Sequence, residues 1–247
     1  MGIDVYGNAV TVNFDHERLV DTGLSNKPTV NQLDDTSVYS IFRRKKHKRR
    51  PHIAAGDGNP FIYALKSMHD ITIAKNEIVR LIPNFNTIIQ ATTELANPEV
   101  IIPMPSAHII ADVVAKRVQK ESLTSSLVNG LFRKATFGEA IANVDLNAID
   151  SKHINKLNVE LGTLKKFKDM EEPFSLKHIK NHYRPAFNPL IINELPEFFG
   201  SVNRITLVDD LLATGTTLRG AIKLLRAELP NVEINSICLL SALKRVV

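Results

Sequence analysis

The stretch Arg204-Ile-Thr-Leu-Val-Asp-Asp-Leu-Leu-Ala-Thr-Gly-Thr-Thr217 decides the fold that this sequence predicts. Residues 205–208 have the length and apolar character of a buried parallel strand. Two acids, Asp209 and Asp210, follow directly, and a loop of small residues then leads into apolar residues at helical spacing over 218–229. Because ligands of α/β sheets lie beyond the carboxyl ends of the strands, we expect a binding site at this strand end.

The loop after the acids has the composition of a phosphate site. Successive backbone N–H groups at a helix N-terminus, together with the helix dipole, favour an anion. Gly215 would let the backbone approach the ligand closely, and the threonine hydroxyls add donors. Two carboxylates would repel a phosphate, so Asp209 and Asp210 are better suited to sugar hydroxyls or a magnesium shell. The predicted phosphate loop comprises Ala213, Thr214, Gly215, Thr216 and Thr217.

Other apolar segments place this stretch in a larger α/β fold. The runs at 100–102 and 232–240 predict two more strands, and 127–132 a further one. Helices are expected at 61–68, 109–118 and 191–199, and over 78–95 with a kink or break at Pro83. Ser106 could cap the helix at 109–118. The alternation of strands and helices predicts a parallel sheet flanked by helices on both faces.

We expect the chain to divide near a turn signal at 57–60. Residues 1–56, polar apart from a short strand at 10–14, would form an N-terminal extension with a basic arm. Residues 57–247 would form the α/β domain. Within it, 121–190, rich in Lys, His, Asn and Glu over its second half, would be a variable hood or insertion of short surface helices.

The stretch at 205–217 resembles the phosphoribosyl-diphosphate (PRPP) binding motif of type I phosphoribosyltransferases, in which two acids precede a Thr-Gly-x-Thr loop. The run Ile101-Ile-Pro-Met-Pro-Ser-Ala-His108 is similar to the diphosphate loop of the ComF-like competence-protein branch, and the segments 59–66 and 184–188 are weaker similarities to that branch. The resemblance covers about residues 57–247 and is strong only at 205–220. It implies a type I phosphoribosyltransferase-like fold.

The same resemblance implies an activity and a set of roles. The enzymes of this family transfer a phosphoribosyl group from PRPP, with Mg²⁺, to a nitrogen acceptor and release diphosphate. Residues 213–217 would bind the 5-phosphate, and Asp209 and Asp210 would be the catalytic acids that hold the ribose hydroxyls and possible ligands of the metal. The diphosphate would be held by Met104, Pro105, Ser106, Ala107 and His108.

Purine-salvage members carry an acid where this chain has Ala213, which weakens a hypoxanthine or guanine assignment. The ComF-like branch has a basic cluster where this chain has only His108, and this departure, with the basic arm, keeps a second function open. The alternative is a PRPP-sensing or nucleic-acid-associated regulatory protein on the same fold. A phosphoacceptor receiver domain does not fit, because its acidic strand lies early in the domain and only residues 218–247 follow the loop here.

The net charge of +5 depends on one basic run, and without its seven charges the chain would carry −2. That run is either a solvated arm or an electrostatic site for nucleic acid, with no aromatic interleaving for base stacking. It consists of Arg43, Arg44, Lys45, Lys46, Lys48, Arg49 and Arg50.

Location and assembly are constrained only loosely by the sequence. No apolar run is long enough to span a bilayer, and the N-terminus lacks a secretory signal. The single cysteine, Cys238, excludes an intrachain disulfide and a cysteine-built zinc site. We therefore expect a cytoplasmic protein without a membrane partner. A dimer is compatible with the sequence, which does not fix the oligomeric state.

Overall fold

The computed structural model describes residues 1–45, 59–167, 169–176, 179–180 and 182–242 as a mixed α/β protein. The chain forms two compact units. The first comprises Met1–Asn129, Ser201–Thr214 and Val232–Val247, and the second Gly130–Gly200 and Gly215–Asn231. The second unit therefore begins and ends differently from the predicted hood at 121–190, and it also includes the helix that follows the phosphate loop.

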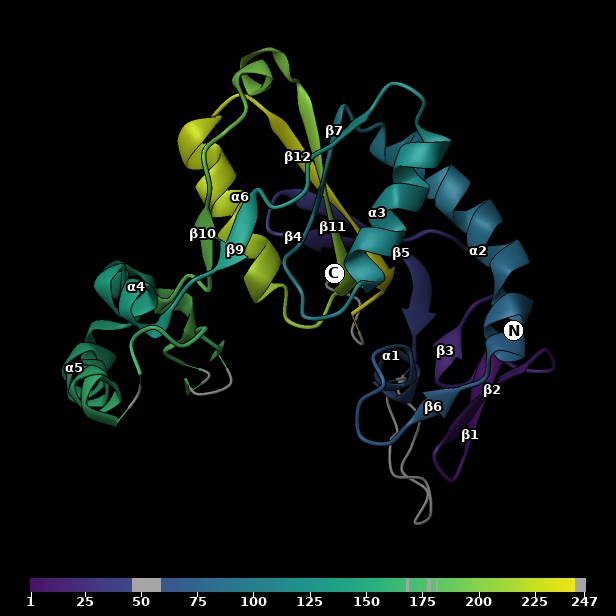
Figure 1. Cartoon of the computed structure of the whole chain (residues 1–247), viewed down its shortest axis with the longest axis horizontal. Coiled ribbons are helices and arrows are strands. Elements are labelled where there is room, and N and C mark those ends of the chain that lie inside the picture. The colour runs from purple at the N-terminus through teal and green to yellow at the C-terminus, as the bar shows by residue number, and fades with distance from the viewer. Residues whose placement is uncertain (46–58, 168, 177–178, 181, 243–247) are drawn as a thin grey trace. The chain divides into compact units, whose positions relative to one another are not determined.

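The first unit is built on a seven-stranded sheet with the strand order β3-β5-β12-β11-β7-β8, in which β4 also pairs with β5 (Figure 1). Strands β5, β12, β11, β7 and β8 run parallel, whereas β3 and β4 are antiparallel to β5. The strands are β3 (Val20–Asp21), β4 (Thr29–Leu33), β5 (Thr36–Arg44), β7 (Val100–Pro103), β8 (Ser126–Leu127), β11 (Arg204–Leu211) and β12 (Glu233–Leu240).

The expectation of a wholly parallel sheet is corrected by this topology. Only two residues, Asp34 and Asp35, join β4 to β5, and so short a connection allows only antiparallel pairing. Asp34 adopts a left-handed conformation with a φ of 59°, as tight hairpin turns require. The three strands predicted at 100–102, 205–208 and 232–240 are confirmed as β7, β11 and β12.

Residues 20–44 supply β3, β4 and β5 to this sheet, so the N-terminal part of the chain is not a separate extension. Ser236 to Leu240 of β12 pair in parallel with Val38 to Phe42 of β5, and Ile41 and Phe42 are buried. The predicted boundary at 56/57 therefore does not separate two parts of the structure. The backbone pairs of β5 and its apolar side chains bind the N-terminal residues to the C-terminal strand.

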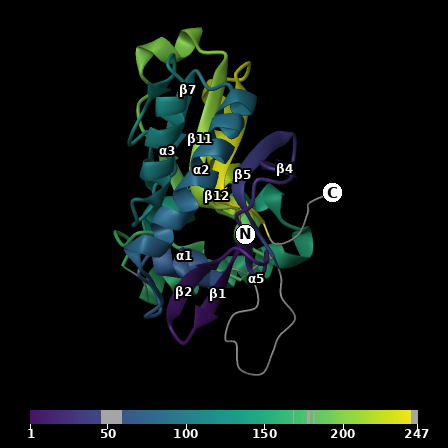
Figure 2. The same ribbon diagram turned by 90° about the vertical axis from the view of Figure 1, so that its right-hand side faces the viewer.

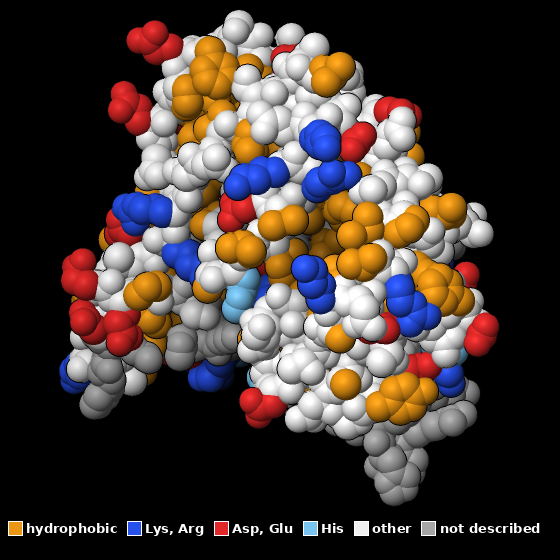
Figure 3. Space-filling model, turned by 45° about the vertical axis from the view of Figure 1, so that its right-hand side comes forward, with side chains coloured by type: hydrophobic (Ala, Val, Ile, Leu, Met, Phe, Trp, Pro, Cys, Tyr) orange, Lys and Arg blue, Asp and Glu red, His pale blue; other side chains and the backbone are white. Residues whose placement is uncertain are grey.

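Two helices pack on the same face of the sheet, as Figures 1 and 2 show. Helix α2 (Lys75–Ala96) contacts β5 and β12, and α3 (Ile110–Glu121) contacts β7 and β11. Helix α2 is not broken at Pro83, because a proline removes only one intrahelical hydrogen bond here and buried Leu81 and Ile88 anchor the turns on both sides of it. The outer sides of these helices keep exposed apolar residues, which gather among Lys and Arg side chains in Figure 3.

A small sheet and a short helix complete the first unit. Strand β2 pairs antiparallel with β1 and parallel with β6. Beside this sheet lies a seven-residue helix whose apolar side chains Phe61, Ile62 and Ala64 are buried in the core shared with α2 and α3. The elements are β1 (Gly2–Tyr6), β2 (Ala9–Asn13), α1 (Asn59–Leu65) and β6 (Thr72–Ile73).

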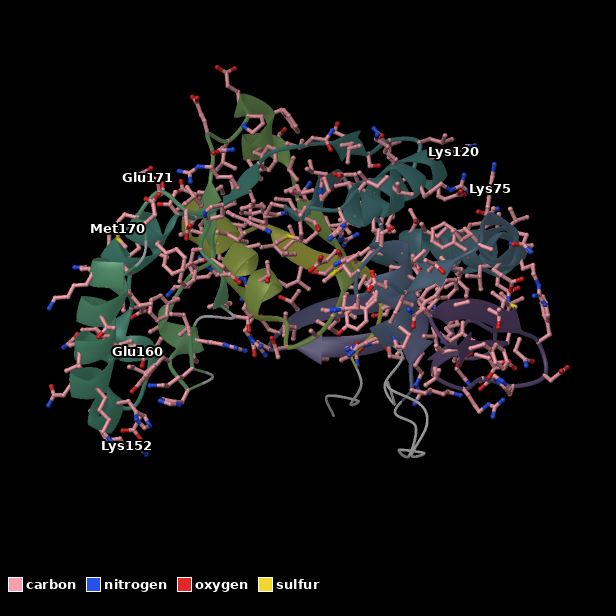
Figure 4. All side chains as sticks on the ribbon, turned by 60° about the horizontal axis from the view of Figure 1, so that its bottom comes forward. Lys75, Lys120, Lys152, Glu160, Met170 and Glu171 are labelled. Atoms are coloured by element: carbon pink, nitrogen blue, oxygen red, sulfur yellow. The ribbon has the colours of Figure 1, made fainter. Side chains whose placement is uncertain are left out.

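The second unit has its own core, in which Phe174 packs edge-on to Phe137 and stacks on Phe187 with ring centroids 5.3 and 5.4 Å apart. Helix α4 begins with a capping box between Thr136 and Glu139. Lys152 and Glu160 lie on the helix α5, labelled in Figure 4. The elements are β9 (Phe132–Lys134), α4 (Phe137–Ala142), α5 (Ser151–Phe167), β10 (Leu190–Ile192) and α6 (Thr216–Glu228).

Three local predictions for this region were wrong. The segment 191–199 is not a helix, since it contains part of β10 and of a 3₁₀ turn at Glu197–Ser201, and Pro196 disfavours a helical residue before it. The strand expected at 127–132 is two strands, β8 and β9, separated at Gly130, whose φ is 72°. Helix α5 has 17 residues and is not a short surface helix.

Within the described residues, no helix combines the length and apolar character needed to cross a bilayer.

Candidate functional site

The two acids of the predicted site are the sixth and seventh residues of β11, so they lie inside the strand rather than after it. Their side chains point to opposite faces, because side chains alternate along a strand. Asp209 is in register with Cys238 of β12 and is half-buried. Asp210 is buried on the same face as Val208, which belongs to the core of the first unit.

Asp210 forms an ion pair with a lysine that the sequence did not single out. The Nζ atom of Lys66 lies 2.6 Å from Oδ2 of Asp210, and the two side chains are only 16% and 8% exposed. Lys66 follows directly after α1, and its backbone N–H donates to the carbonyl of Ile62 at 3.0 Å. The core packing of α1 therefore places the ammonium group of Lys66 at the end of β11.

Asp209 is in an environment that favours its neutral form. Burial raises the pKa of its carboxyl from 3.8 to about 7, and the charge of Asp210 adds to the rise. The backbone N–H of Asp210, which donates to Oδ1 of Asp209 at 2.8 Å, and the charge of Lys66 act in the opposite direction. Burial, with the charges of both acids, also raises the pKa of Cys238 well above its ordinary value. Cys238 is therefore a protonated thiol rather than a nucleophile.

The predicted diphosphate loop begins beside the acids. The backbone N–H of Met104 donates to the carbonyl of Val208 at 2.8 Å, so the chain leaves β7 next to the residue before Asp209. Met104 is buried, Pro105 and His108 are half-buried, and Ser106 and Ala107 are exposed. This pairing within the first unit places the acids and the start of the loop at one edge of the sheet.

Ser106 does not cap the following helix. Its hydroxyl accepts a hydrogen bond from the backbone N–H of His108 at 3.2 Å, which forms a local turn. Helix α3 begins later, at Ile110, with Ile109 at the N-cap position and no side-chain cap. The capping prediction was wrong because the serine lies four residues before the first helical residue.

The predicted phosphate loop crosses from one unit into the other. Ala213 and Thr214 end the part of β11 and its loop that belongs to the first unit, and both are exposed. In the second unit, Gly215 occupies the N-cap position of α6 with a left-handed φ of 73°, and Thr216 and Thr217 begin the helix. The left-handed conformation explains why glycine stands at this position.

The basic run at 43–50 is divided by the structure. Arg43 and Arg44 belong to β5, and Arg44 is buried. Lys45 forms an ion pair with Glu17. Because Arg44 faces the protein interior, it cannot serve as a nucleic-acid contact, and that part of the prediction was wrong. Lys46, Lys48, Arg49 and Arg50 lie outside the described residues.

Arg44 ties together three segments around the site. Its Nε donates to the carbonyl of Ser241 at 2.8 Å, its Nη1 to the side-chain oxygen of Asn59, and its Nη2 to the carbonyl of Leu212 at 3.3 Å. These contacts join the ends of β12 and β11 to the start of α1. Sequence reasoning missed the roles of both Arg44 and Lys66. The weak similarity noted at 59–66 was the one available signal for Lys66, whereas Arg44 was hidden in a run that resembles a solvated arm.

The described residues contain no group of three or more His, Cys, Asp or Glu side chains that could hold a metal ion. Asp209 and Asp210, whose side chains point to opposite faces of β11, are oxygen donors at this edge of the sheet. No protein-family model matches the chain, and no curated protein matches it either.

Proposed function

We propose that this chain is a phosphoribosyltransferase-like protein that binds PRPP with Mg²⁺ and transfers the phosphoribosyl group to a nitrogen acceptor, releasing diphosphate. The observation that carries the proposal is the acid pair Asp209–Asp210 at the end of a central parallel strand, with the loop after β7 hydrogen-bonded beside it through Met104 and Val208 at 2.8 Å. Ligand sites of α/β sheets occupy this edge. A type I phosphoribosyltransferase-like fold is part of the proposal.

Each proposed role follows from the chemistry of the residues. Carboxylates accept hydrogen bonds from hydroxyl groups, so Asp209 and Asp210 would hold the ribose diol. Backbone N–H groups at a helix N-terminus favour anions, so 213–217 would hold the 5-phosphate, and 104–108 the diphosphate. Along the chain, only Leu211 and Leu212 separate Asp210 from the first residue of this loop.

The protein supplies only part of a magnesium coordination shell, as expected for an ion that binds together with the phosphates of a substrate. Mg²⁺ is commonly bound through one or two carboxylates together with the phosphates of a substrate. Asp209 and Asp210 would supply the carboxylates, and the diphosphate of PRPP would supply the remaining oxygens. The ion would offset charge on the departing diphosphate, while the protein positions the ribose and the acceptor.

The second candidate is a protein that binds PRPP without turning it over. The observation that favours it is the composition of the loop Met104–His108, which holds no Lys or Arg to neutralise a diphosphate. Backbone groups and Mg²⁺ would then be the main partners of the diphosphate. Such a protein would report PRPP concentration or act with nucleic acid, instead of making a nucleotide.

Calorimetric titration of PRPP, with and without magnesium, tests the site. At a pH above about 7, where Asp209 is ionised, wild type should bind only with magnesium. Asp209→Asn should then reduce the affinity by at least about tenfold, the loss expected when a charged hydrogen-bond partner is removed. Asp112→Asn, at an exposed acid on α3, is the matched control and should bind as wild type does. Asp209→Asn is preferred to a double variant, because Asp210 is buried and paired with Lys66.

Diphosphate release from PRPP then separates the two candidates. The assay is run with a panel of nucleobases and other nitrogen acceptors, and with a generic oligonucleotide. Release that depends on one acceptor and is lost in Asp209→Asn supports the transferase. Binding without release across the panel supports the sensing protein, and equal PRPP affinity in wild type and Asp209→Asn contradicts the site.

A further inference from the structure

Helix α1 is held against the end of β11 at both of its ends. At its first residue, the side-chain oxygen of Asn59 accepts a hydrogen bond from Arg44, whose Nη2 donates to the carbonyl of Leu212 at 3.3 Å. Directly after its last residue, Lys66 pairs with Asp210 at 2.6 Å. Both connections reach residues at or just beyond the end of the strand that carries the acid pair.

The body of α1 is fixed by core packing. Phe61 and Ile62 are 1% and 2% exposed, and the ring of Phe61 packs edge-on against Phe42 of β5 with centroids 6.2 Å apart. A helix anchored in this way has little freedom to shift along the sheet, because protein cores are close-packed. The side chain of Lys66 therefore starts from a backbone position that the core determines.

The turn after Lys66 is also constrained. Ser67, His69 and Asp70 have φ angles of 51°, 57° and 57°, a left-handed conformation that residues with side chains rarely adopt. The N–H of Met68 donates to the carbonyl of Tyr63 at 2.9 Å and closes the turn back onto α1. Such conformations persist only where the surrounding structure imposes them, and they gather at functional sites.

The charge of Lys66 acts on the acid pair in a largely dry environment. Two neighbouring carboxylates repel one another, and the repulsion is stronger where water is excluded. The Lys66 ammonium lies within hydrogen-bond distance of Oδ2 of Asp210, and both side chains are less than a fifth exposed.

We propose that Lys66 is a positioning residue of the ligand site, which fixes the carboxylate of Asp210 and offsets its charge so that the acid pair can receive the ribose hydroxyls and magnesium of PRPP. This inference rests on the proposed function. Lys66 acts on the ligand through Asp210 and makes no contact with the reacting atoms. If Lys66 only stabilised the fold, its replacement would lower the unfolding temperature and leave the PRPP affinity of the folded protein unchanged.

The test compares Lys66→Met, Lys66→Gln and Lys66→Arg with Lys75→Met, an exposed lysine at the first residue of α2 (Figure 4). PRPP affinity is measured by calorimetry over a series of magnesium concentrations, and thermal unfolding is recorded in parallel. Lys66→Met and Lys66→Gln should weaken PRPP binding roughly tenfold, as expected for loss of a charge-assisted hydrogen bond, and should require more magnesium for half-maximal binding. Lys66→Arg should recover most of the affinity, and Lys75→Met should bind as wild type.

The outcomes separate this inference from the proposed function. If wild type does not bind PRPP, the proposed function fails and the role of Lys66 fails with it. If wild type binds PRPP and Asp209→Asn does not, but Lys66→Met binds normally in its folded state, only the role of Lys66 is overturned. If Lys66→Met does not fold, the comparison is made between Lys66→Gln and Lys66→Arg. Equal PRPP affinity of these two variants overturns the role of Lys66, and a higher affinity of Lys66→Arg supports it.

Discussion

Arg44→Met should lower the free energy of unfolding by about 3–5 kcal/mol, because it leaves buried hydrogen-bond acceptors without a donor. Methionine keeps most of the aliphatic packing of the arginine stem but none of its N–H groups. The carbonyls of Ser241 and Leu212, in residues 1% and 4% exposed, each lose an arginine donor at 2.8 and 3.3 Å. Each would cost roughly 1–3 kcal/mol, and the half-buried Asn59 adds a smaller loss, since water can reach it.

Thermal unfolding followed by circular dichroism measures this effect. For a chain of this size, such a loss corresponds to a decrease in unfolding temperature of about 10 °C. Arg43→Met is the matched control, since Arg43 is the half-buried neighbour of Arg44 on β5, and its replacement should change stability by less than about 0.5 kcal/mol. The backbone bond from Arg44 N–H to Ser241 Oγ at 3.0 Å is retained in the variant. Equal effects of the two substitutions would refute the assignment of Arg44 as a buried link between β5, β11, β12 and α1.

Two further predictions concern the loop and the acid pair. Gly215→Val should lose PRPP binding more completely than Thr216→Val in a calorimetric titration. A side chain at a φ of 73° is strained by about 1–2 kcal/mol and blocks the close approach of a phosphate. Equal losses in the two variants would contradict a special role of the glycine backbone. Between pH 3.8 and about 7, native Asp209 holds a proton that the unfolded chain has lost, so the unfolding free energy should fall as pH rises through this window. Asp209→Asn should flatten this dependence in urea titrations and be more stable than wild type above pH 7, and parallel pH profiles of the two proteins would contradict the raised pKa.

The central strands and the place of the acid pair could be predicted because their signals are local. Residues 205–208 and 100–102 are short apolar runs that end at polar or proline-rich loops, a pattern typical of buried parallel strands. The helical spacing of apolar residues likewise located α2, α3 and α6. Gly215 was recognised for the same reason, since a small residue before a helix indicates a special backbone conformation.

Predictions failed where a local pattern had two solutions. The apolar residues of 191–199 suit a helix or a strand, and pairing of β10 with β9 selected the strand. Arg43 and Arg44 continue a basic run, but they also end a strand, and pairing of β3 and β12 with β5 placed them in the sheet. A local sequence pattern gives no information on the energy of pairing between strands that are far apart in the chain.

By itself, the sequence determined that this is an α/β chain with adjacent acids at the end of a buried strand, because hydrophobic periodicity and turn chemistry act over a few residues. Only the tertiary structure decided which charges meet those acids. Lys66 reaches Asp210, and Arg44 reaches the backbone of Leu212 and Ser241, across long intervals of sequence. The physical reason is that burial decides where a charged side chain must find a partner, and burial is a property of the assembled core rather than of any segment.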